Sequence, residues 1–398
     1  MLRNIFRSLK KIMVIILASS LLCAGLCYIG QISDQRLSAN STCNANAIPQ
    51  GHDAIQKIKI PGSVKCPSIS NGIIYYGDKE GGFCALDSKT GSLFWCYKTE
   101  SIVCTTAAVS DTAVYFGTTD GHLCALDKTT GRELWTFAAG GLLQWSSIII
   151  SPALSDGVVY FGAHNNKFYA VDAKTGLQKW VFKTDTSLGA KLIKLFIKSP
   201  VEYNHRIKAI TPVIRDGIVY FPSDNYYVYA IDVSTGVEKW RFYSKAFVAV
   251  TPALVDKTMY FGTVDGDFYA VDSTTGKQKW VFQTVYPIYS SPSVAAEMVY
   301  FGNAEGYAYA LDLITGKEKW KIKAPDSINS SLVTANGLVY LVCDEGNLYA
   351  VDMQGYGKWK YQISGMIKSS ISMTDGVLYF SCNDDYLYEL QVSPLFNG

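Results

Sequence analysis

The sequence has almost no charge imbalance and few of the residues on which catalytic and metal sites are built. Its 398 residues carry 36 Lys and Arg against 34 Asp and Glu, a formal net charge of +2. Without a strongly basic surface, a nucleic-acid partner is not expected. The four histidines do not pair at metal-ligand spacing, and no GxSxG, HExxH, GxxxxGK[ST] or GxGxxG string occurs. We therefore predict no catalytic residue, no cofactor-binding residue and no metal ligand.

Cysteine motifs are also missing, although the chain has ten cysteines. None stands in CxxC or CxxCH, and no two are adjacent. These absences argue against haem attachment, thioredoxin-type chemistry and zinc knuckles.

Long apolar runs are absent except for one near the start of the chain. Residues Ile12–Ile29 are uncharged and apolar, and four basic residues precede them: Arg3, Arg7, Lys10 and Lys11. This order predicts an export signal or membrane anchor over residues 1–30, with its start in the cytoplasm. The protein is thus expected in the periplasm or cell envelope, associated with the membrane through this segment or through a partner. Polar residues 31–53 follow and are typical of a flexible tether.

Three fates of this segment stay open. Leu37-Ser38-Ala39 resembles a site of signal cleavage, whereas the length of the run is just sufficient for an uncleaved anchor. Cys23 and Cys27 offer a lipid attachment, although each follows a leucine where a lipoprotein signal has a smaller residue.

What dominates the rest of the chain is a repeat of about 40 residues. Seven tryptophans end successive copies, and each has a glycine four positions before it. The tryptophans are Trp95, Trp135, Trp180, Trp240, Trp280, Trp320 and Trp359. Each copy contains four short segments rich in β-branched and aromatic residues, separated by Asp-Gly, Asn-Asn or Thr-Gly turns. Each copy therefore predicts a four-stranded antiparallel sheet.

A recurring aspartate opens the last turn of each copy. These residues are Asp87, Asp127, Asp172, Asp232, Asp272 and Asp312. Because they recur identically, we interpret them as structural carboxylates that hold turn amides, rather than as catalytic groups.

Small sheets of this kind bury their faces when they pack around an axis, with a tryptophan in each wedge, so the fold class predicted is an all-β propeller. After Trp359 the chain supplies three more strands without a fourth, and Gln56–Ile60 resembles a fourth strand with Ile58 in the tryptophan position. We predict an eight-bladed propeller over residues 54–392, closed by the N-terminal strand, with a C-terminal tail at 393–398.

The repeated positions also bear on the cysteines. Cys84 and Cys124 are equivalent, as are Cys343 and Cys382. Bridges between neighbouring copies are one interpretation; buried thiols that act as small apolar residues are the one we favour.

The longest insertion lies between the third and fourth copies, Thr184–Ala209. It is weakly amphipathic and combines lysines with apolar residues, as at Leu192, Lys194, Leu195 and Phe196. Long loops of repeat proteins often carry function, so these residues form a candidate partner-binding loop. A tolerated insertion packed on the rim is the alternative.

The string A-V-D-S-T-T-G-K-Q-K-W from Ala270 to Trp280 resembles the repeat of PQQ-like, quinoprotein-type propellers, and the resemblance extends from Ile55 to Val392. That repeat is shared by quinone-dependent dehydrogenases and by non-enzymatic propellers such as the BamB lipoprotein of outer-membrane β-barrel assembly. The dehydrogenases have longer chains and an adjacent Cys-Cys pair over the quinone, which this sequence lacks. The resemblance therefore implies a BamB-like scaffold without a cofactor. Its partners would be envelope proteins such as the main barrel-assembly subunit, which members of that family bind through inter-blade loops. A PQQ-dependent dehydrogenase and an anchored sensor or adhesive ectodomain are the alternatives.

Overall fold

One copy of the sequence repeat corresponds to one four-stranded antiparallel sheet in the computed structural model of the chain. The chain divides into two units, Met1–Thr42 and Cys43–Gly398, and every described residue lies in the second. The structure describes residues 56–60, 65–78, 80–103, 105–140, 146–185, 210–363, 365–367, 371–374, 376–384 and 386–392. The segments predicted as signal or anchor (1–30), tether (31–53) and C-terminal tail (393–398) lie outside these ranges.

The first four blades follow the chain in order. Blade 1 is β2 (Lys65–Ser70), β3 (Ile73–Gly77), β4 (Gly82–Asp87) and β5 (Leu93–Lys98). Blade 2 is β6 (Ala108–Val109), β7 (Ala113–Gly117), β8 (His122–Asp127) and β9 (Glu133–Ala138). Blade 3 is β10 (Ile148–Ser155), β11 (Val158–Ala163), β12 (Lys167–Asp172) and β13 (Gln178–Lys183). Blade 4 is β14 (Val213–Arg215), β15 (Ile218–Pro222), β16 (Tyr227–Asp232) and β17 (Glu238–Tyr243).

The last four blades include one that joins the two ends of the repeat region. Blade 5 is β18 (Ala253–Val255), β19 (Thr258–Gly262), β20 (Asp267–Asp272) and β21 (Gln278–Gln283). Blade 6 is β22 (Ser293–Ala295), β23 (Met298–Gly302), β24 (Tyr307–Asp312) and β25 (Glu318–Lys323). Blade 7 is β26 (Val333–Ala335), β27 (Leu338–Val342), β28 (Asn347–Asp352) and β29 (Gly357–Gln362). Blade 8 is β30 (Ser372–Thr374), β31 (Val377–Ser381), β32 (Tyr386–Gln391) and β1 (Gln56–Lys59).

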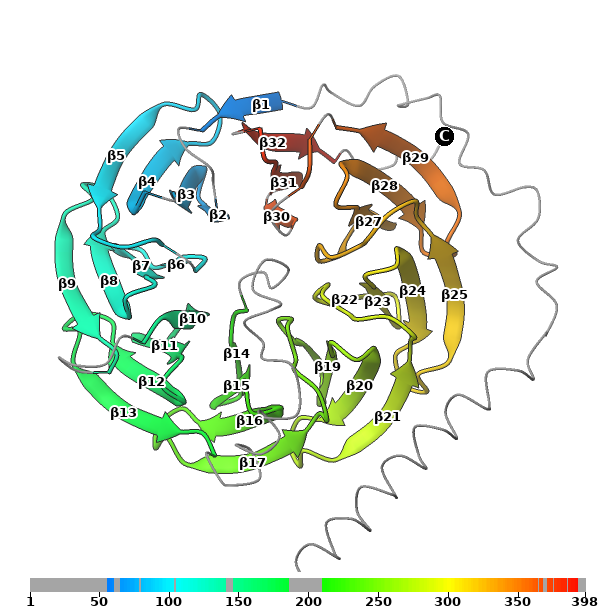
Figure 1. Cartoon of the computed structure of the whole chain (residues 1–398), viewed down its shortest axis with the longest axis horizontal. Coiled ribbons are helices and arrows are strands. Elements are labelled where there is room, and N and C mark those ends of the chain that lie inside the picture. Colours follow the sequence, from blue (N-terminus) through cyan, green and yellow to red (C-terminus); the bar gives the residue numbers. More distant parts are fainter. Residues whose placement is uncertain are drawn as a thin grey trace, which may run out of the picture. The chain divides into compact units, whose positions relative to one another are not determined.

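The eight blades stand around a common axis, with the first strand of each nearest the axis and the fourth at the outside (Figure 1). The predicted all-β, eight-bladed propeller is confirmed. No helix that is long and apolar enough to cross a membrane occurs within the described ranges.

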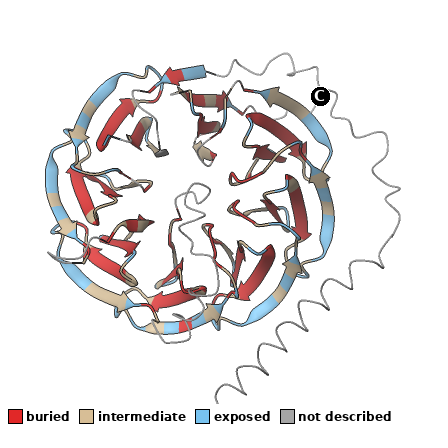
Figure 2. Ribbon diagram, viewed as in Figure 1, coloured by how far each residue is buried: buried red, intermediate tan, exposed pale blue. Residues whose placement is uncertain are grey.

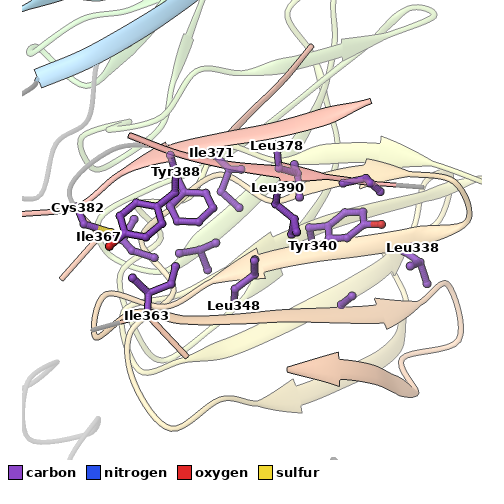
Figure 3. Close-up of a cluster of buried hydrophobic side chains, with 14 residues drawn as sticks. Leu338, Tyr340, Leu348, Ile363, Ile367, Ile371, Leu378, Cys382, Tyr388 and Leu390 are labelled. Atoms are coloured by element: carbon purple, nitrogen blue, oxygen red, sulfur yellow. The ribbon is translucent and has the colours of Figure 1, made fainter. Parts of the chain in front are cut away.

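The core consists of the layers between neighbouring blades. The second and third strands are buried almost throughout, whereas the outer strands alternate between exposed and half-buried residues (Figure 2). Figure 3 shows one such layer, in which Tyr340 and Leu348 of blade 7 pack against Leu378, Tyr388 and Leu390 of blade 8. Because each sheet is covered on both faces by its neighbours, apolar residues occupy consecutive positions along its central strands.

Six of the seven repeat tryptophans, all but Trp359, pack on the glycine of the last turn in the next blade. A Cβ atom added to Gly276 would lie 2.7 Å from Cδ2 of Trp240, and the same contact recurs between Gly316 and Trp280 at 2.5 Å. These glycines have φ near 70°, which glycine adopts without strain. In blades 2 to 7, the glycine four residues before the tryptophan therefore serves both its own turn and the tryptophan of the preceding blade.

The ring is closed by β1, which pairs with β32 antiparallel. The register differs from the prediction, since Gln56 lies opposite Glu389 and Ile58 lies opposite Leu387. Glu389 is the counterpart of the alanines that face the tryptophans elsewhere, so Gln56 occupies the tryptophan position and the assignment of Ile58 to it was wrong. The side chain of Ile58 nevertheless lies against Gly91, where a Cβ would come within 2.9 Å of its Cγ2. A branched side chain two residues further along thus takes over the glycine contact of the missing indole.

The cysteines do not form the bridges between neighbouring copies that the sequence allowed. Cys84 of β4 forms a disulfide with Cys96 of β5, directly opposite in the same blade, with a Cα–Cα distance of 4.1 Å. Cys124, Cys343 and Cys382 are free and buried, which corresponds to the favoured interpretation for these three. The Cys84 pairing escaped prediction because Cys96 stands on the outer strand, outside the repeated cysteine position.

Candidate protein-binding face

The propeller has two faces that differ in chemistry. Four antiparallel strands place the turns between the first and second and between the third and fourth strands on one side of each blade. We call this the turn face; it carries the Asp-x-x-Thr-Gly turns. The turn between the second and third strands and the connection to the next blade lie on the other side, which we call the connection face.

The turn face is uniform because the same carboxylate organises each blade. In blade 4, Oδ1 of Asp232 accepts hydrogen bonds from the amides of Ser234 and Thr235 and from both hydroxyls. The hydrogen bond from the Ser234 hydroxyl holds the pKa of Asp232 well below its usual range. The second cause is Lys239, whose ammonium lies 3.1 Å from the carboxylate. Equivalent turn bonds are made by Asp87, Asp127, Asp172, Asp272 and Asp312. Each recurring aspartate thus has its accepting oxygen occupied by its own turn.

The connection face is where the blades differ from one another. The connection between blades 5 and 6 exposes Val285 and Tyr286, with relative exposures of 86% and 39%. The position of Val285 is charged in two other connections, as Glu100 and Lys245, and the position of Tyr286 is there the small residue Ser101 or Ala246. Exposed apolar residues at such a loop are typical of contact sites for other proteins.

Blades 3 and 4 add an aromatic and charged cluster beside the long insertion. The rings of Tyr227 and Tyr243 lie 5.2 Å apart, and the guanidinium of Arg241 lies 5.3 Å from the centre of the Tyr227 ring. Arg241 also forms an ion pair of 3.2 Å with Asp185, the second residue of the insertion. Tyrosine and arginine are enriched at protein interfaces, where they combine large contact area with directional bonds.

The two ends of the insertion are held firmly. The Asp185 amide donates to the Tyr229 hydroxyl at 3.1 Å, and the Asn225 side-chain amide donates to the Asp185 carbonyl at 3.0 Å. At the far end, the Ile210 carbonyl accepts from the Ser151 amide at 2.7 Å. The predicted binding residues Leu192, Lys194, Leu195 and Phe196 lie outside the described residues, but the anchors of their segment belong to the connection face.

A buried carboxylate organises the neighbouring connection in blade 5. Asp267 is 7% exposed and accepts hydrogen bonds from the Tyr269 hydroxyl at 2.8 Å and from the Gln283 amide at 3.0 Å. Burial raises the pKa of Tyr269, and the hydrogen bond to the Asp267 carboxylate raises it further. Both carboxylate oxygens have a partner within the protein, so the group stabilises this part of the rim.

The described residues lack a donor set for a metal ion. Among the described residues, no three His, Cys, Asp or Glu side chains lie together in a way that could hold a metal ion. His122 pairs with Asp120 at 3.1 Å, and the sequence has no adjacent cysteines that could cover a quinone. The described residues therefore do not fit a metal ion or the cysteine-covered quinone of the dehydrogenases.

Comparison with protein families gives a match over most of the chain. Residues 50–186 and 197–393 match the family model described as outer membrane protein assembly factor BamB. The chain belongs to this family. Its repeats are accordingly PQQ-like repeats of the BamB type, as the sequence motif indicated. A comparison with curated protein sequences finds no significant match.

Solved structures share the fold at low sequence identity. BamB from Moraxella catarrhalis is 18% identical, with a TM-score of 0.70 over 86% of this chain and 98% of that chain. The quinohemoprotein alcohol dehydrogenase from Comamonas testosteroni is 17% identical, with a TM-score of 0.64 over 85% of this chain and 74% of that one. The computationally designed Ika8 protein is also 17% identical, with a TM-score of 0.68 over 85% of this chain and 100% of that chain. The fold is therefore common to a BamB, an enzyme and a designed protein, and function must be argued from the faces.

Val285, Tyr286 and the Arg241–Asp185 pair were not found by sequence reasoning. The signal for Val285 and Tyr286 was present as two large apolar residues where two other connections begin with Glu100 and Lys245. The Arg241–Asp185 contact had no signal, because 56 residues separate its partners.

Proposed function

We propose that this protein is a non-enzymatic scaffold of the bacterial envelope that binds other proteins through its connection face, in the assembly of outer-membrane β-barrel proteins. Membership of the BamB family supports the class of function. The observation that carries the choice of face is the exposed Val285-Tyr286 pair, beside blades whose long insertion is anchored through Asp185.

The partner expected is a protein with apolar and acidic side chains at its contact surface. Val285 and Tyr286 offer apolar area, and Arg241 and Lys245 offer positive charge on the same rim, with side chains 41% and 65% exposed. Burial of the apolar pair would stabilise the complex, while the charges would favour correct orientation.

Site-specific photo-crosslinking in the intact cell envelope tests this proposal with a matched control. A crosslinking residue at Val285 should capture an outer-membrane assembly protein. The same residue at Ile314, which is 83% exposed but lies on the turn face, should not. Equal capture at both positions, or capture at Ile314 alone, would refute the assignment of the face.

Charge substitutions provide a second test of the proposed binding face. The double variant V285E/Y286E should lose co-purification of the captured protein, whereas I314E should retain it. Full co-purification with V285E/Y286E would contradict the proposal. If the protein reduced a redox dye after addition of the quinone and calcium, it would instead belong with the dehydrogenases.

A separate measurement tests the proposed attachment to the envelope. Mass spectrometry of the mature protein should find one of three N-termini: one after Ala39, a lipidated Cys23 or Cys27, or the intact start. An intact start combined with no crosslinked assembly protein would favour an anchored sensor or adhesive ectodomain.

A further inference from the structure

The closing blade carries a carboxylic acid where every other blade carries alanine. On the third strand of blades 1 to 7, an alanine lies directly opposite the tryptophan of the fourth strand. These alanines are Ala85, Ala125, Ala170, Ala230, Ala270, Ala310 and Ala350. In blade 8 the position is Glu389, and its cross-strand partner is Gln56. The seam between blades 8 and 1 therefore has a glutamate and no indole.

The indole that is missing at the seam has a defined role elsewhere. The Nε1–H of Trp240 donates to the carbonyl of Ser273 at 2.9 Å, across the junction to blade 5. Trp95, Trp135, Trp180, Trp280 and Trp320 make the same bond to the residue that follows the turn aspartate of the next blade. At the seam, the equivalent carbonyl belongs to Ser88, next to Asp87. An ionised Glu389 has no proton to donate to it, but a neutral Glu389 has one.

Glu389 faces this seam from a half-buried position. Paired and alternate residues of a strand share a face, so Glu389 lies on the side of Leu387 and Ile58, which pack against blade 1. Its Oε1 is buried and has no hydrogen-bond partner among the described residues. A buried carboxylate oxygen without a partner is costly when it is charged.

The charged groups around Glu389 make ionisation less favourable still. From blade 1, Asp87 adds a second negative charge, and Cys84 is held in a disulfide and does not titrate. Burial, and after it Asp78, raises the pKa of Tyr76 in blade 1 to about 12, so its hydroxyl is neutral between pH 5 and pH 8. On β31, Tyr379 lies directly opposite Glu389. The nearest cation of β1, Lys57, lies 5.0 Å from the centre of the Tyr388 ring, on the opposite side of the sheet. Burial, and after it the charge of Asp87, raises the pKa of Glu389 to about 7.

We propose that Glu389 is a proton-dependent latch of the ring, which in its neutral form donates a hydrogen bond across the seam to blade 1 and on ionisation weakens the hold of β1. The inference concerns closure of the propeller and does not depend on the proposed partner. The latch acts on the strand that closes the ring, and β1 has four residues where the fourth strands of the other blades have six.

The direction of the pH effect follows from the two states of the carboxyl group. In the opened state Glu389 is hydrated and has its ordinary pKa of 4.5. In the closed ring its pKa is raised to about 7. The closed state therefore binds the proton more tightly. Its advantage is complete below pH 4.5 and is lost as the pH rises through 7.

Hydrogen exchange of the intact protein, followed by mass spectrometry at pH 5 and pH 8, tests the latch. After correction for the intrinsic exchange rate, protection of β1 and β32 should fall by roughly 10- to 100-fold from pH 5 to pH 8. Strands β20 and β21 of blade 5 serve as the internal reference and should not change. Unchanged protection of β1 in the wild-type protein would overturn the proposal without any variant.

Variants separate Glu389 from other titrating groups. E389Q keeps an N–H donor at every pH, and E389A restores the residue of the other blades, so both should remove the pH dependence of β1. E318Q, at an exposed glutamate on β25, should retain it. A pH dependence in E389Q equal to that of the wild type would refute the assignment. If E389Q fails to fold, E389A and the wild-type protein still decide the outcome.

Discussion

The contact between a tryptophan and the glycine of the next blade predicts a stability difference between two glycine substitutions. Gly276 has a φ of 71°, and a Cβ at this position would lie 2.7 Å from Cδ2 of Trp240. Gly157 also has a φ of 71°, but a Cβ there would meet nothing within 4 Å. The two positions thus share the backbone conformation and differ in what surrounds them.

The expected loss of stability is the sum of a backbone cost and, at Gly276, a packing cost. Alanine in the left-handed region costs about 1–2 kcal/mol, and this applies to Gly157→Ala and Gly276→Ala alike. At Gly276 the added methyl group must also displace a tryptophan packed between two blades, and overpacking of this kind costs about 1–3 kcal/mol more. We expect Gly276→Ala to lower the free energy of unfolding by about 2–5 kcal/mol, and Gly157→Ala by about 1–2 kcal/mol.

Urea denaturation followed by tryptophan fluorescence measures the difference. The two variants are compared with the wild type at the same protein concentration, and the midpoints are read with the slope of each transition. Equal destabilisation by the two substitutions would refute the packing argument, because backbone strain alone would then explain both. A smaller effect at Gly276 than at Gly157 would refute it as well.

Three further outcomes are expected. Ile58→Asp should lower the melting temperature in calorimetry because Ile58 is 7% exposed in the seam. Lys59→Asp, at an exposed position of the same strand, should change it little. Equal effects of the two substitutions would argue against closure by β1. Alkylation of the unfolded, unreduced protein followed by mass spectrometry should leave Cys84 and Cys96 unmodified, and labelling of either would contradict the disulfide. Asp232→Asn should be less stable than the wild type at pH 7. The difference in melting temperature should narrow as the pH falls below 4, because the pKa of Asp232 is lowered and its contribution is lost progressively on acidification. A difference as large at pH 2 as at pH 7 would contradict this.

Much of the architecture could be predicted because each repeat carries its own local signals. The turn aspartates and the glycines with positive φ act within a few residues of their own position, so spacing along the chain is enough to recognise them. The large apolar residues of the central strands recur at the same positions in every copy and predict sheets that are covered on both faces. The count of eight required one further step, the assignment of Gln56–Lys59 to the last blade, which the pairing of β1 with β32 confirms.

Prediction of the candidate site was less complete because its parts are brought together by different blades. The Arg241–Asp185 pair joins residues on either side of the long insertion, and no periodicity in the sequence relates them. The apolar character of Val285 and Tyr286 could be read from the sequence, but their exposure depends on how the connection leaves blade 5. The four loop residues proposed from sequence stay a prediction.

The sequence by itself determined the repeat, the strand and turn chemistry of each blade and the closure of the ring by its first strand, because these depend on short-range preferences that act in every copy. The tertiary structure decided which residues face one another where two copies meet. It set the register that places Gln56 opposite Glu389, the disulfide between Cys84 and Cys96, and the seam in which a carboxyl group replaces an alanine and no indole is present. Each of these depends on contacts across strands or blades, where a shift of two residues along a strand keeps the apolar pattern but changes every partner.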